Sequence, residues 1–405
     1  MSQVIAIVGA NIAGASAAEG LRNRGFDGRI VLIGDESWRP YERPPLSKDA
    51  LRSGEAAAPR YLHDETFYDQ QKIELRLGSR VEKIDRSRGV LVMNDGDEVA
   101  ASQVLLCTGT RARKLSVPGA DLDGIHYLRT HDDALQLAKR LSPSARVVII
   151  GMGVIGAEVA ASAVGLGCSV TAIEPADVLM ERAVGRFAGA WLAQEHIRRG
   201  TSLRLQTGVG RFIGHAGRLL AVETSRGERI EADVAVIGVG VVPADELARD
   251  AGLRVENGIV IDAAGRSSCP EILAAGDVAS QCNFFGEQVR METYTNAYEQ
   301  AVAAAATMVG EPAGYSGVPY AWSDQFDVNI QIAGRTRQDA DMTVRGDPAS
   351  GGFSVLYQRA GVLEGIVAIN RPRDISGGKR LISQRWGGPA EILADTATDL
   401  RKLKQ

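Results

Sequence analysis

The chain has 405 residues, a length that accommodates roughly two to four domains of ordinary size. Hydrophobic residues make up 45% of it and charged residues 24%, a globular composition that excludes a disordered, collagen-like or coiled-coil chain. The formal net charge of −4 provides no overall positive field to attract phosphates, so the composition predicts no general nucleic-acid binding.

The apolar segments and the cysteines indicate where such a protein works. Residues 1–14 carry no Lys or Arg ahead of the apolar run, unlike a secretory signal, and the later apolar stretches at 147–156 and 301–309 are shorter than the ~18 residues of a membrane-spanning helix. The four cysteines form no C-x-x-C or zinc-like spacing, and the five histidines form no metal-binding motif. We therefore expect a soluble, cytoplasmic protein without a membrane segment or a metal site.

The first predicted element is a strand that enters a glycine-rich turn. The apolar run from Ile5 ends at Gly9, and Gly14 follows five residues later. Asn11 stands where dinucleotide-binding turns usually carry a second glycine, which lets the pyrophosphate approach the backbone. We expect Asn11 to restrict that approach, although Asn tolerates unusual backbone angles better than most residues.

A helix and a second strand follow this turn. Small residues over 15–24 predict the helix, and the apolar run over 29–34 predicts the strand. Asp35 comes directly after the strand, 21 residues past Gly14, where a carboxylate can bind a ribose. The segment therefore predicts a βαβ dinucleotide site.

The same pattern returns 142 residues later with all three glycines present. Gly151, Gly153 and Gly156 end an apolar run and lead into a second helix, and Glu174 ends the strand predicted over 169–173. The N-terminus of such a helix binds phosphate, and Glu174 can accept hydrogen bonds from both ribose hydroxyls. Because a carboxylate there repels a 2′-phosphate, the second copy predicts an NADH site.

Further strands complete the predicted sheets. Three apolar runs end in glycine, at 104–109, 234–240 and 272–276, and Asp277 follows the last of them. The fold class that we predict is α/β, with two nested Rossmann-like dinucleotide-binding domains and a C-terminal α+β domain. The predicted boundaries are 1–110 with 240–317 for the first dinucleotide domain, 111–239 for the second, and 318–405 for the last.

Several motifs together resemble one family. The chain resembles the FAD-dependent NADH:ferredoxin reductases of bacterial oxygenase systems, which have a glutathione-reductase-like fold. The motifs that carry the resemblance are Arg-Pro-Tyr-Glu-Arg-Pro-Pro-Leu-Ser-Lys at 39–48, Cys-Thr-Gly at 107–109, Ala-Gly-Asp at 275–277 and Trp-Ser-Asp-Gln at 322–325. Residues 242–248 and 292–297 look particularly like the reductase components of aromatic-ring dioxygenases; other members serve haem-thiolate monooxygenases.

The resemblance implies a function and site residues. NADH would reduce bound FAD, and single electrons would pass to a [2Fe-2S] ferredoxin that feeds an oxygenase. Lys48, Glu158 and Trp322 would be the catalytic residues: Lys48 near the flavin, Glu158 orienting the nicotinamide amide, and Trp322 beside the flavin edge. The FAD contacts would be Gly9, Ala13, Gly14, Asp35, Arg43, Lys48, Val81, Gly109, Arg129, Asp277 and Tyr294. The NADH contacts would be Gly151, Gly153, Val154, Ile155, Gly156, Glu158, Glu174, Arg182 and Gly238.

Structural alternatives exist for four of these residues. Arg43 with the two prolines after it could form only a rigid surface turn, and Lys48 could be a solvated helix lysine. Trp322 could be a core aromatic, and Asp277 could cap a helix.

The cysteines narrow the electron acceptor. Disulphide reductases on this scaffold need a redox cysteine pair beside the flavin, and here Cys107 is the first cysteine of the chain. We therefore expect Cys107, Cys168, Cys269 and Cys282 to be buried or inert, and the electrons to leave directly. A rubredoxin reductase, an NADH oxidase and a flavin-bound signalling protein resembling apoptosis-inducing factors remain the alternatives.

A basic segment near the C-terminus is a candidate docking surface. Five basic residues stand close together with a single acid, Asp374, among them: Arg371, Arg373, Lys379, Arg380 and Arg385. Ferredoxins are usually acidic, so this segment could attract one, although a solvated helix face would have the same composition.

Overall fold

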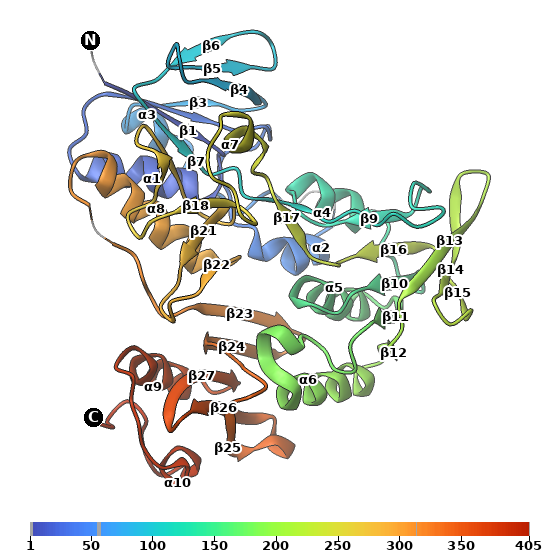
Figure 1. The fold of residues 1–405 in the computed structure, drawn as a ribbon. Coiled ribbons are helices and arrows are strands. Elements are labelled where there is room, and N and C mark those ends of the chain that lie inside the picture. Colours follow the sequence, from blue (N-terminus) through green and yellow to red (C-terminus); the bar gives the residue numbers. More distant parts are fainter. Residues whose placement is uncertain (1–2, 55–57, 313, 405) are drawn as a thin grey trace. The chain divides into compact units, whose positions relative to one another are not determined.

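The computed structural model describes residues 3–54, 58–312 and 314–404 (Figure 1). The chain divides into two compact units, each assembled from three segments. Unit 1 consists of Met1–Glu42, Pro59–Arg111 and Val241–Pro319, and unit 2 of Arg43–Ala58, Ala112–Gly240 and Tyr320–Gln405. Unit 1 contains the first glycine-rich turn, and unit 2 contains the second one together with the C-terminal residues.

Unit 1 is built on a sheet with the strand order β19-β20-β7-β1-β2-β3, parallel except at β19. Alternate residues of β1 face opposite sides: Ile5 and Ile7 pack with the helices α1 and α8, and Ala6 and Val8 pack with residues of β4 to β6 and β18. Burial on both faces explains why the strand is a continuous apolar run.

The elements of unit 1 are β1 (Val4–Val8), α1 (Ile12–Asn23), β2 (Arg29–Ile33), α3 (Phe67–Gln70), β3 (Ile73–Arg76), β4 (Val81–Asp85), β5 (Val90–Met93), β6 (Glu98–Ala100), β7 (Gln103–Leu106), α7 (Glu246–Asp250), β18 (Ile259–Ile261), β19 (Arg266–Cys269), β20 (Ile272–Ala274), β21 (Ala279–Cys282), β22 (Gln288–Arg290) and α8 (Tyr294–Met308). Two short strands, β8 (Thr110–Ala112) and β17 (Val241–Pro243), lie where the chain passes from one unit to the other.

Unit 2 contains a parallel sheet with the order β12-β11-β10-β16-β9. Its helix α5 is buried over all residues from Gly156 to Ala163, and Ala157, Val159, Ala160 and Ala163 are fully buried. The elements of this part are η1 (Pro44–Ser47), α2 (Asp49–Arg52), β9 (Ile125–Tyr127), α4 (His131–Ala138), β10 (Arg146–Ile150), α5 (Val154–Gly165), β11 (Ser169–Glu174), α6 (Glu181–Arg198), β12 (Ser202–Leu205), β13 (Val209–His215), β14 (Arg218–Thr224), β15 (Arg229–Glu231) and β16 (Val234–Ile237).

The C-terminal part of unit 2 is an antiparallel sheet with the order β23-β24-β27-β26-β25. Helix α9 is amphipathic and packs Ile375, Leu381 and Ile382 against β24 and β27. The elements are β23 (Tyr320–Gln325), β24 (Val328–Gly334), β25 (Asp341–Asp347), η2 (Pro348–Ser350), β26 (Gly352–Arg359), β27 (Val362–Ile369), α9 (Pro372–Ser383) and α10 (Ala390–Ala394). The two parallel sheets and this α+β part confirm the predicted fold class.

Two local predictions differ from the structure. Helices α1 and α5 begin at Ile12 and Val154, three residues before the predicted starts, because each helix starts inside its glycine-rich turn. Asp277 does not cap a helix; it lies in the turn between β20 and β21. Within the described ranges, no helix is long and apolar enough to cross a membrane.

Candidate dinucleotide sites

The first glycine-rich turn, in unit 1, is held together by close backbone contacts. Gly9 has a φ of 119°, and a Cβ there would lie 2.1 Å from the carbonyl oxygen of Cys107. A Cβ on Gly14 would lie 2.0 Å from the carbonyl oxygen of Gly9. Both glycines are therefore required by the protein itself, because a side chain would collide with backbone.

Asn11 caps α1, a role that the sequence analysis did not assign to it. Its backbone is extended (φ −125°, ψ −168°), so this position does not need a residue that tolerates unusual backbone angles. The side-chain oxygen accepts hydrogen bonds from the N–H groups of Ala13 (3.0 Å) and Gly14 (3.3 Å), and the side-chain nitrogen donates to the carbonyl of Cys107 (2.6 Å). Asn11 is thus the N-cap of α1, and it occupies two N–H groups that a phosphate could otherwise accept from.

The second turn, in unit 2, repeats the contacts without the cap. A Cβ on Gly151 would lie 2.6 Å from the carbonyl oxygen of Gly238, and one on Gly156 would lie 1.9 Å from that of Gly151. The N-cap position of α5 is Gly153, which has no side chain to bond the first helical N–H groups. These N–H groups point away from the helix, where an anion can accept from them.

Gly153 gives the clearest indication of a ligand. Its φ is −70°, which any residue can adopt, and a Cβ built on it meets no atom within 4 Å. Nothing in the protein therefore requires glycine at this position. A pyrophosphate approaching the backbone does require it, so the second turn fits a dinucleotide.

The two turns also place their acids differently. In β11 the last residue is Glu174, whose carboxylate accepts from the N–H groups of Met152 (2.6 Å) and Ala176 (2.9 Å). The strand register pairs Ile150 with Ile173 and Val8 with Ile33, so Gly34, not Asp35, occupies the position of Glu174.

A side chain at this position of the first turn has no room. A Cβ on Gly34 would lie 2.5 Å from the Cβ of Ala10. The acid of unit 1 is displaced by one residue, and Asp35 is exposed to solvent. Its neighbour Glu36 is half-buried and accepts a hydrogen bond from the Tyr41 hydroxyl at 2.5 Å. Glu36 is a second acid at this strand end, and the spacing from Gly14 to Asp35 did not single it out.

The other FAD contacts predicted in unit 1 lie around the ends of its strands. Gly109 follows β7 with a φ of 67°, and Gly276, just before Asp277, lies against Ala13, with 3.0 Å between the alanine Cβ and a Cβ built on the glycine. Tyr294 is the first residue of α8, and burial raises the pKa of its hydroxyl. Val81 is the first residue of β4, and its side chain is buried in the core. Only its backbone is therefore available to a ligand.

The predicted contacts of unit 2 lie at three places besides Glu158, Lys48 and the turn glycines. Val154, Ile155 and Gly238 surround the second turn, and the Ile155 side chain is 43% exposed although it is large and apolar. Arg182 is exposed in the first turn of α6.

Arg43 and Arg129 form the third of these places. The Arg43 guanidinium donates to the carbonyl oxygen of Arg129 at 2.5 Å. Leu46 and Ser47, which follow the two prolines, are buried within the short helix η1. The segment therefore enters the interior of unit 2 at Leu46, while Arg43 and the two prolines are themselves half-buried.

The centre of unit 2 contains a buried carboxylate with four donors. Glu158, on α5, is 3% exposed; its Oε2 accepts from the Lys48 ammonium at 2.8 Å and from the Ser47 hydroxyl. Its Oε1 accepts from the Ser323 hydroxyl (2.8 Å) and from the N–H of Asp324 (3.3 Å). Lys48 is therefore not a solvated lysine, and the structure brings two of the three predicted catalytic residues together. Ser47 and Ser323 were missed, although each stands in a motif that the sequence singled out.

Trp322, the third predicted catalytic residue, precedes Ser323 on β23. It is half-buried and stacks on Tyr320 with the ring centroids 6.2 Å apart, so it is not a core aromatic. The Lys379 ammonium of α9 lies 5.2 Å from the centre of the Tyr320 ring. The aromatic pair therefore connects β23 to the basic helix.

The four cysteines are free thiols, and three of them are buried. Burial raises the pKa values of Cys107 and Cys168, which keeps these thiols protonated and unreactive. Cys282 is exposed, which the sequence did not indicate.

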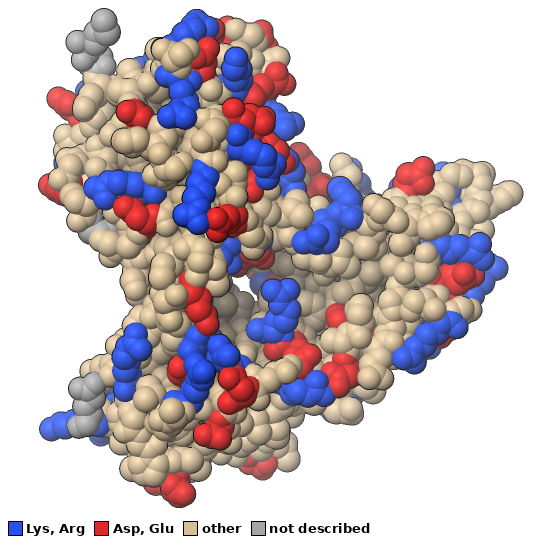
Figure 2. Space-filling view, viewed as in Figure 1, with Lys and Arg blue, Asp and Glu red and all other residues tan. Residues whose placement is uncertain are grey.

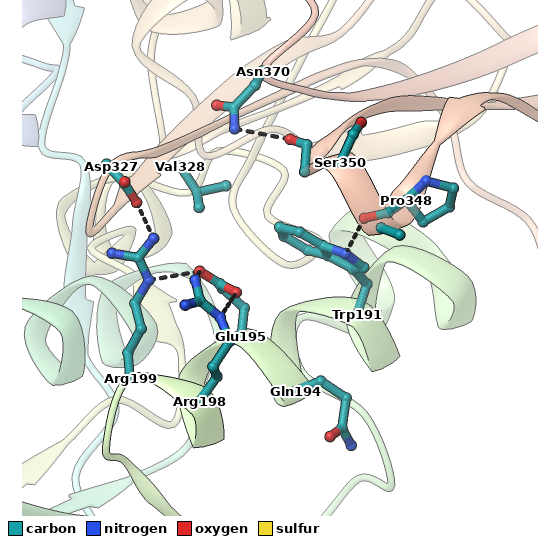
Figure 3. Close-up of a pocket in the computed structure, with 12 residues that line it drawn as sticks. Trp191, Gln194, Glu195, Arg198, Arg199, Asp327, Val328, Pro348, Ser350 and Asn370 are labelled. Atoms are coloured by element: carbon teal, nitrogen blue, oxygen red, sulfur yellow. Dashed lines mark hydrogen bonds and ion pairs between the residues drawn. The ribbon is translucent and has the colours of Figure 1, made fainter.

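A pocket of about 440 Å³ lies elsewhere in unit 2, where α6 faces the C-terminal sheet (Figure 3). Figure 3 shows Trp191 donating to the carbonyl oxygen of Pro348, at 3.0 Å. Arg198 and Arg199 both pair with Glu195, and Arg199 also pairs with Asp327. Because the charges compensate one another, we assign no cofactor to this pocket.

Two glycine-rich turns at the carboxyl ends of parallel strands, each followed by a helix, define an oxidoreductase with two dinucleotide sites. The chain belongs to the pyridine nucleotide-disulphide oxidoreductase family, whose model matches residues 3–301; a reductase C-terminal model matches residues 320–404. Members use FAD and NAD(H), which are the cofactors of this chain, and the resemblance found in the sequence is confirmed.

Relatives with known roles cover nearly the whole chain. The biphenyl dioxygenase system ferredoxin–NAD(+) reductase component of Paraburkholderia xenovorans is 39% identical, over 100% of this chain and 98% of its own. The ferredoxin reductase for the CYP199A2 system from Rhodopseudomonas palustris has a TM-score of 0.96 at 36% identity and covers 99% of both chains. Putidaredoxin reductase, in its covalent complex with putidaredoxin, has a TM-score of 0.95 at 33% identity and covers 99% of this chain and 97% of its own.

Proposed function

We propose that the chain is a ferredoxin–NAD(+) reductase that takes a hydride from NADH onto bound FAD and passes single electrons to a [2Fe-2S] ferredoxin. The ferredoxin would feed an oxygenase, either an aromatic-ring dioxygenase or a haem-thiolate monooxygenase. The observation that carries the proposal is the pair of unlike dinucleotide turns in a chain whose relatives work in such systems. FAD supplies the step from two-electron to one-electron chemistry.

The residues of the second turn support NADH as the electron donor. Glu174 is fixed by two backbone N–H groups beside the turn, so its charge remains where a 2′-phosphate would have to bind. Gly153 leaves the helix N–H groups open to the pyrophosphate, and Ile155 offers exposed apolar surface at the same helix end. The individual contacts of both cofactors remain part of the proposal.

Lys48 and Glu158 would act as a unit. The Lys48 ammonium is a positive charge with little exposure, which can stabilise a negative charge that develops during reduction. Glu158 keeps this ammonium in place with one oxygen. Because both of its oxygens already accept hydrogen bonds, orienting the nicotinamide amide would require one of the four donors to give way.

The thiols support direct electron exit. Two of the three buried cysteines have raised pKa values, and Cys282 stands in β21 without a second cysteine near it in sequence. Persistent free thiols also suit a reducing compartment, so we place the protein in the cytoplasm.

We propose the exposed side of α9 as the ferredoxin-docking surface, with a correction to its predicted members. Arg380 donates to the carbonyl oxygens of Leu400 (3.1 Å) and Leu403 (2.5 Å) and so holds the C-terminal segment. Arg371 pairs with Asp374 at 2.9 Å. The docking residues on α9 are then chiefly Arg373 and Lys379, and Arg385 lies two residues beyond the end of the helix.

The charge of this surface would act locally. Figure 2 shows basic and acidic side chains interspersed over the face in view, in keeping with the net charge of −4. A ferredoxin would therefore meet local attraction at α9, where the Lys379 ammonium lies over the Tyr320 ring, on which Trp322 stacks. Steering of this kind weakens with salt because the screening length falls from about 10 Å at 0.1 M to about 3 Å at 1 M.

The experiment that tests the function measures cytochrome c reduction by the FAD-loaded protein with NADH, with and without a panel of purified ferredoxins and rubredoxins. We expect reduction that depends on a [2Fe-2S] ferredoxin. Rapid NADH consumption without any carrier would identify an NADH oxidase, and reduction by rubredoxin alone would identify a rubredoxin reductase. Binding of both cofactors with negligible turnover would favour a signalling protein.

The docking surface is tested with Arg373→Glu and Lys379→Glu together, at low and high salt. We expect the ferredoxin concentration for half-maximal rate to rise about tenfold at low salt, and direct reduction of FAD by NADH to stay unchanged. Arg229→Glu, on the exposed strand β15, is the matched control. If the α9 double variant and Arg229→Glu raise the half-maximal ferredoxin concentration equally, the ferredoxin docks elsewhere.

A further inference from the structure

We infer that His196, Gln325 and Ser323 position the Glu158–Lys48 pair through one continuous chain of buried hydrogen bonds. The inference rests on the proposed function, because it assigns these residues to the pair that serves reduction by NADH. All members of the chain belong to unit 2.

The links of the chain are short and connect three elements. At the C-terminal end of α6, the His196 ring contacts the Gln325 side-chain oxygen through Nε2 (3.0 Å) and the Thr201 hydroxyl through Nδ1 (3.3 Å). Gln325 donates to the Ser323 hydroxyl at 3.1 Å, and Ser323 donates to Glu158 Oε1 at 2.8 Å. The chain therefore runs from α6 along β23 to α5.

The chemistry of each group fixes the direction of every bond. Burial lowers the pKa of His196, so the ring is neutral and carries a single N–H. The Gln325 oxygen can only accept, which places that hydrogen on Nε2 and leaves Nδ1 to accept from Thr201. Each donor then points toward Glu158, and bonds aligned in this way polarise one another.

Burial raises the free-energy cost of breaking these hydrogen bonds. The exposed fractions are 0% for His196 and Ser323, 1% for Gln325 and 3% for Glu158. A polar group in such surroundings is costly without a partner, so the carboxylate is kept in the orientation that satisfies Ser323 and Lys48 together. Gln325 is fixed further by a second hydrogen bond, from its Nε2 to the Met180 sulfur at 3.0 Å.

The first test examines the FAD-loaded protein without NADH, by NMR of the ¹⁵N-labelled His196 ring. We expect an Nε2–H resonance that Glu158→Gln shifts, although three hydrogen bonds separate the two residues. In a Ser323→Ala background, the same Glu158→Gln change should shift the resonance by less than half as much. Gln325→Met breaks the chain at another link and should also remove the response.

A matched control exists in the C-terminal sheet. Ser354 is fully buried and donates to the carboxylate of Asp374 (3.0 Å), which is paired with Arg345. Ser354→Ala therefore removes a serine of the same kind without touching the chain, and should leave the Glu158→Gln response at His196 intact. An equal response with and without Ser323, or no response to Glu158→Gln, overturns the inference.

The second test measures reduction of bound FAD by NADH in a single turnover without any carrier. Ser323→Ala should lower the limiting rate about tenfold, since displacement of a positioned group by ~1 Å can cost up to ~10²-fold, with the half-saturating NADH concentration within about twofold. Ser323→Thr should restore most of the rate, and Ser354→Ala should not change it. Equal limiting rates in Ser323→Ala and Ser354→Ala overturn the positioning role. Failure to reduce ferredoxin would instead concern the proposed function, because this measurement uses no ferredoxin.

Discussion

The two glycine-rich turns have the same backbone arrangement but differ in the residue at the N-cap of the helix that follows. In both, a Cβ on the last glycine would lie 2.0 Å or less from the carbonyl oxygen of the first glycine. In the first turn a side chain, Asn11, caps the helix; in the second turn Gly153 leaves the cap open. The closed cap belongs to the turn that we assign to FAD, and the open one to the turn that we assign to NADH.

The difference teaches which glycines serve the fold and which serve a ligand. Gly14 and Gly156 are required by packing, because backbone atoms occupy the space of a side chain. Gly153 has neither a collision nor an unusual φ; glycine is favoured at an N-cap, and at this N-cap it also leaves room for a ligand to approach the backbone. The free N–H groups at the start of α5 can bind a pyrophosphate directly, whereas Asn11 already occupies two of those at the start of α1.

The largest effect is expected where packing requires glycine. Gly156→Ala places a methyl group 1.9 Å from the carbonyl oxygen of Gly151, and we expect a loss of about 1–3 kcal/mol of stability together with loss of NADH binding. Thermal unfolding of the FAD-loaded protein measures it. The control is Gly165→Ala at the end of the same helix, where a Cβ meets nothing within 4 Å. Equal melting temperatures for the two variants would show that the turn can relax.

The second effect concerns cofactor choice. Glu174→Gln removes the charge that repels a 2′-phosphate and should narrow the preference for NADH over NADPH about tenfold, since a tenfold change in kcat/KM corresponds to about 1.4 kcal/mol. Steady-state kcat/KM values for both cofactors measure it. Asp35→Asn, at the first turn, should leave the preference unchanged. A changed preference in Asp35→Asn and not in Glu174→Gln would reverse the assignment of the two turns.

A smaller effect is expected at the capped turn. Asn11→Ala removes the acceptor for Ala13 and Gly14, and loss of such a cap costs about 1 kcal/mol of stability. We expect a small drop in the melting temperature with the half-saturating NADH concentration unchanged. A weakened NADH interaction without any loss of stability would contradict the role of Asn11 as a cap of the first turn.

The smallest effect is expected at the thiols. Replacing all four cysteines by Ser or Ala should leave ferredoxin reduction within about twofold, apart from packing losses at the buried sites. Alkylation of the native protein should modify the exposed Cys282 first, without loss of activity. Inactivation of a folded, FAD-loaded variant would show that a thiol takes part in turnover.

The sequence predicts those features that are local or periodic. The strands around each turn, the positions of Gly9, Gly151 and Glu174, and the fold class follow from apolar runs and glycine spacing. The predicted starts of α1 and α5 lie three residues beyond the observed ones. Each helix begins directly after its N-cap residue, and Gly14 and Gly156 lie within the first turn without interrupting it.

Long-range side-chain contacts could not be predicted in this way. Glu158 bonds Ser47 and Ser323, which are 111 and 165 residues away, and such pairs leave no periodic signal in a single sequence. The same holds for Arg380, which donates to the carbonyl oxygens of Leu400 and Leu403, 20 and 23 residues further along the chain. The one-residue displacement of Asp35 relative to Glu174 became visible only through the strand register.

The central claim is that the two turns hold different dinucleotides, and Gly153→Ala tests it most directly. The measurement is equilibrium titration of the FAD-loaded variant with NAD⁺, together with its FAD content and melting temperature. The account predicts a dissociation constant for NAD⁺ at least about tenfold higher, because the added Cβ meets no protein atom and would meet the ligand. It also predicts one FAD per chain and a loss of stability of no more than about 1 kcal/mol, the cost of alanine at the N-cap of α5. Unchanged NAD⁺ binding, or loss of FAD with NAD⁺ binding intact, would contradict it.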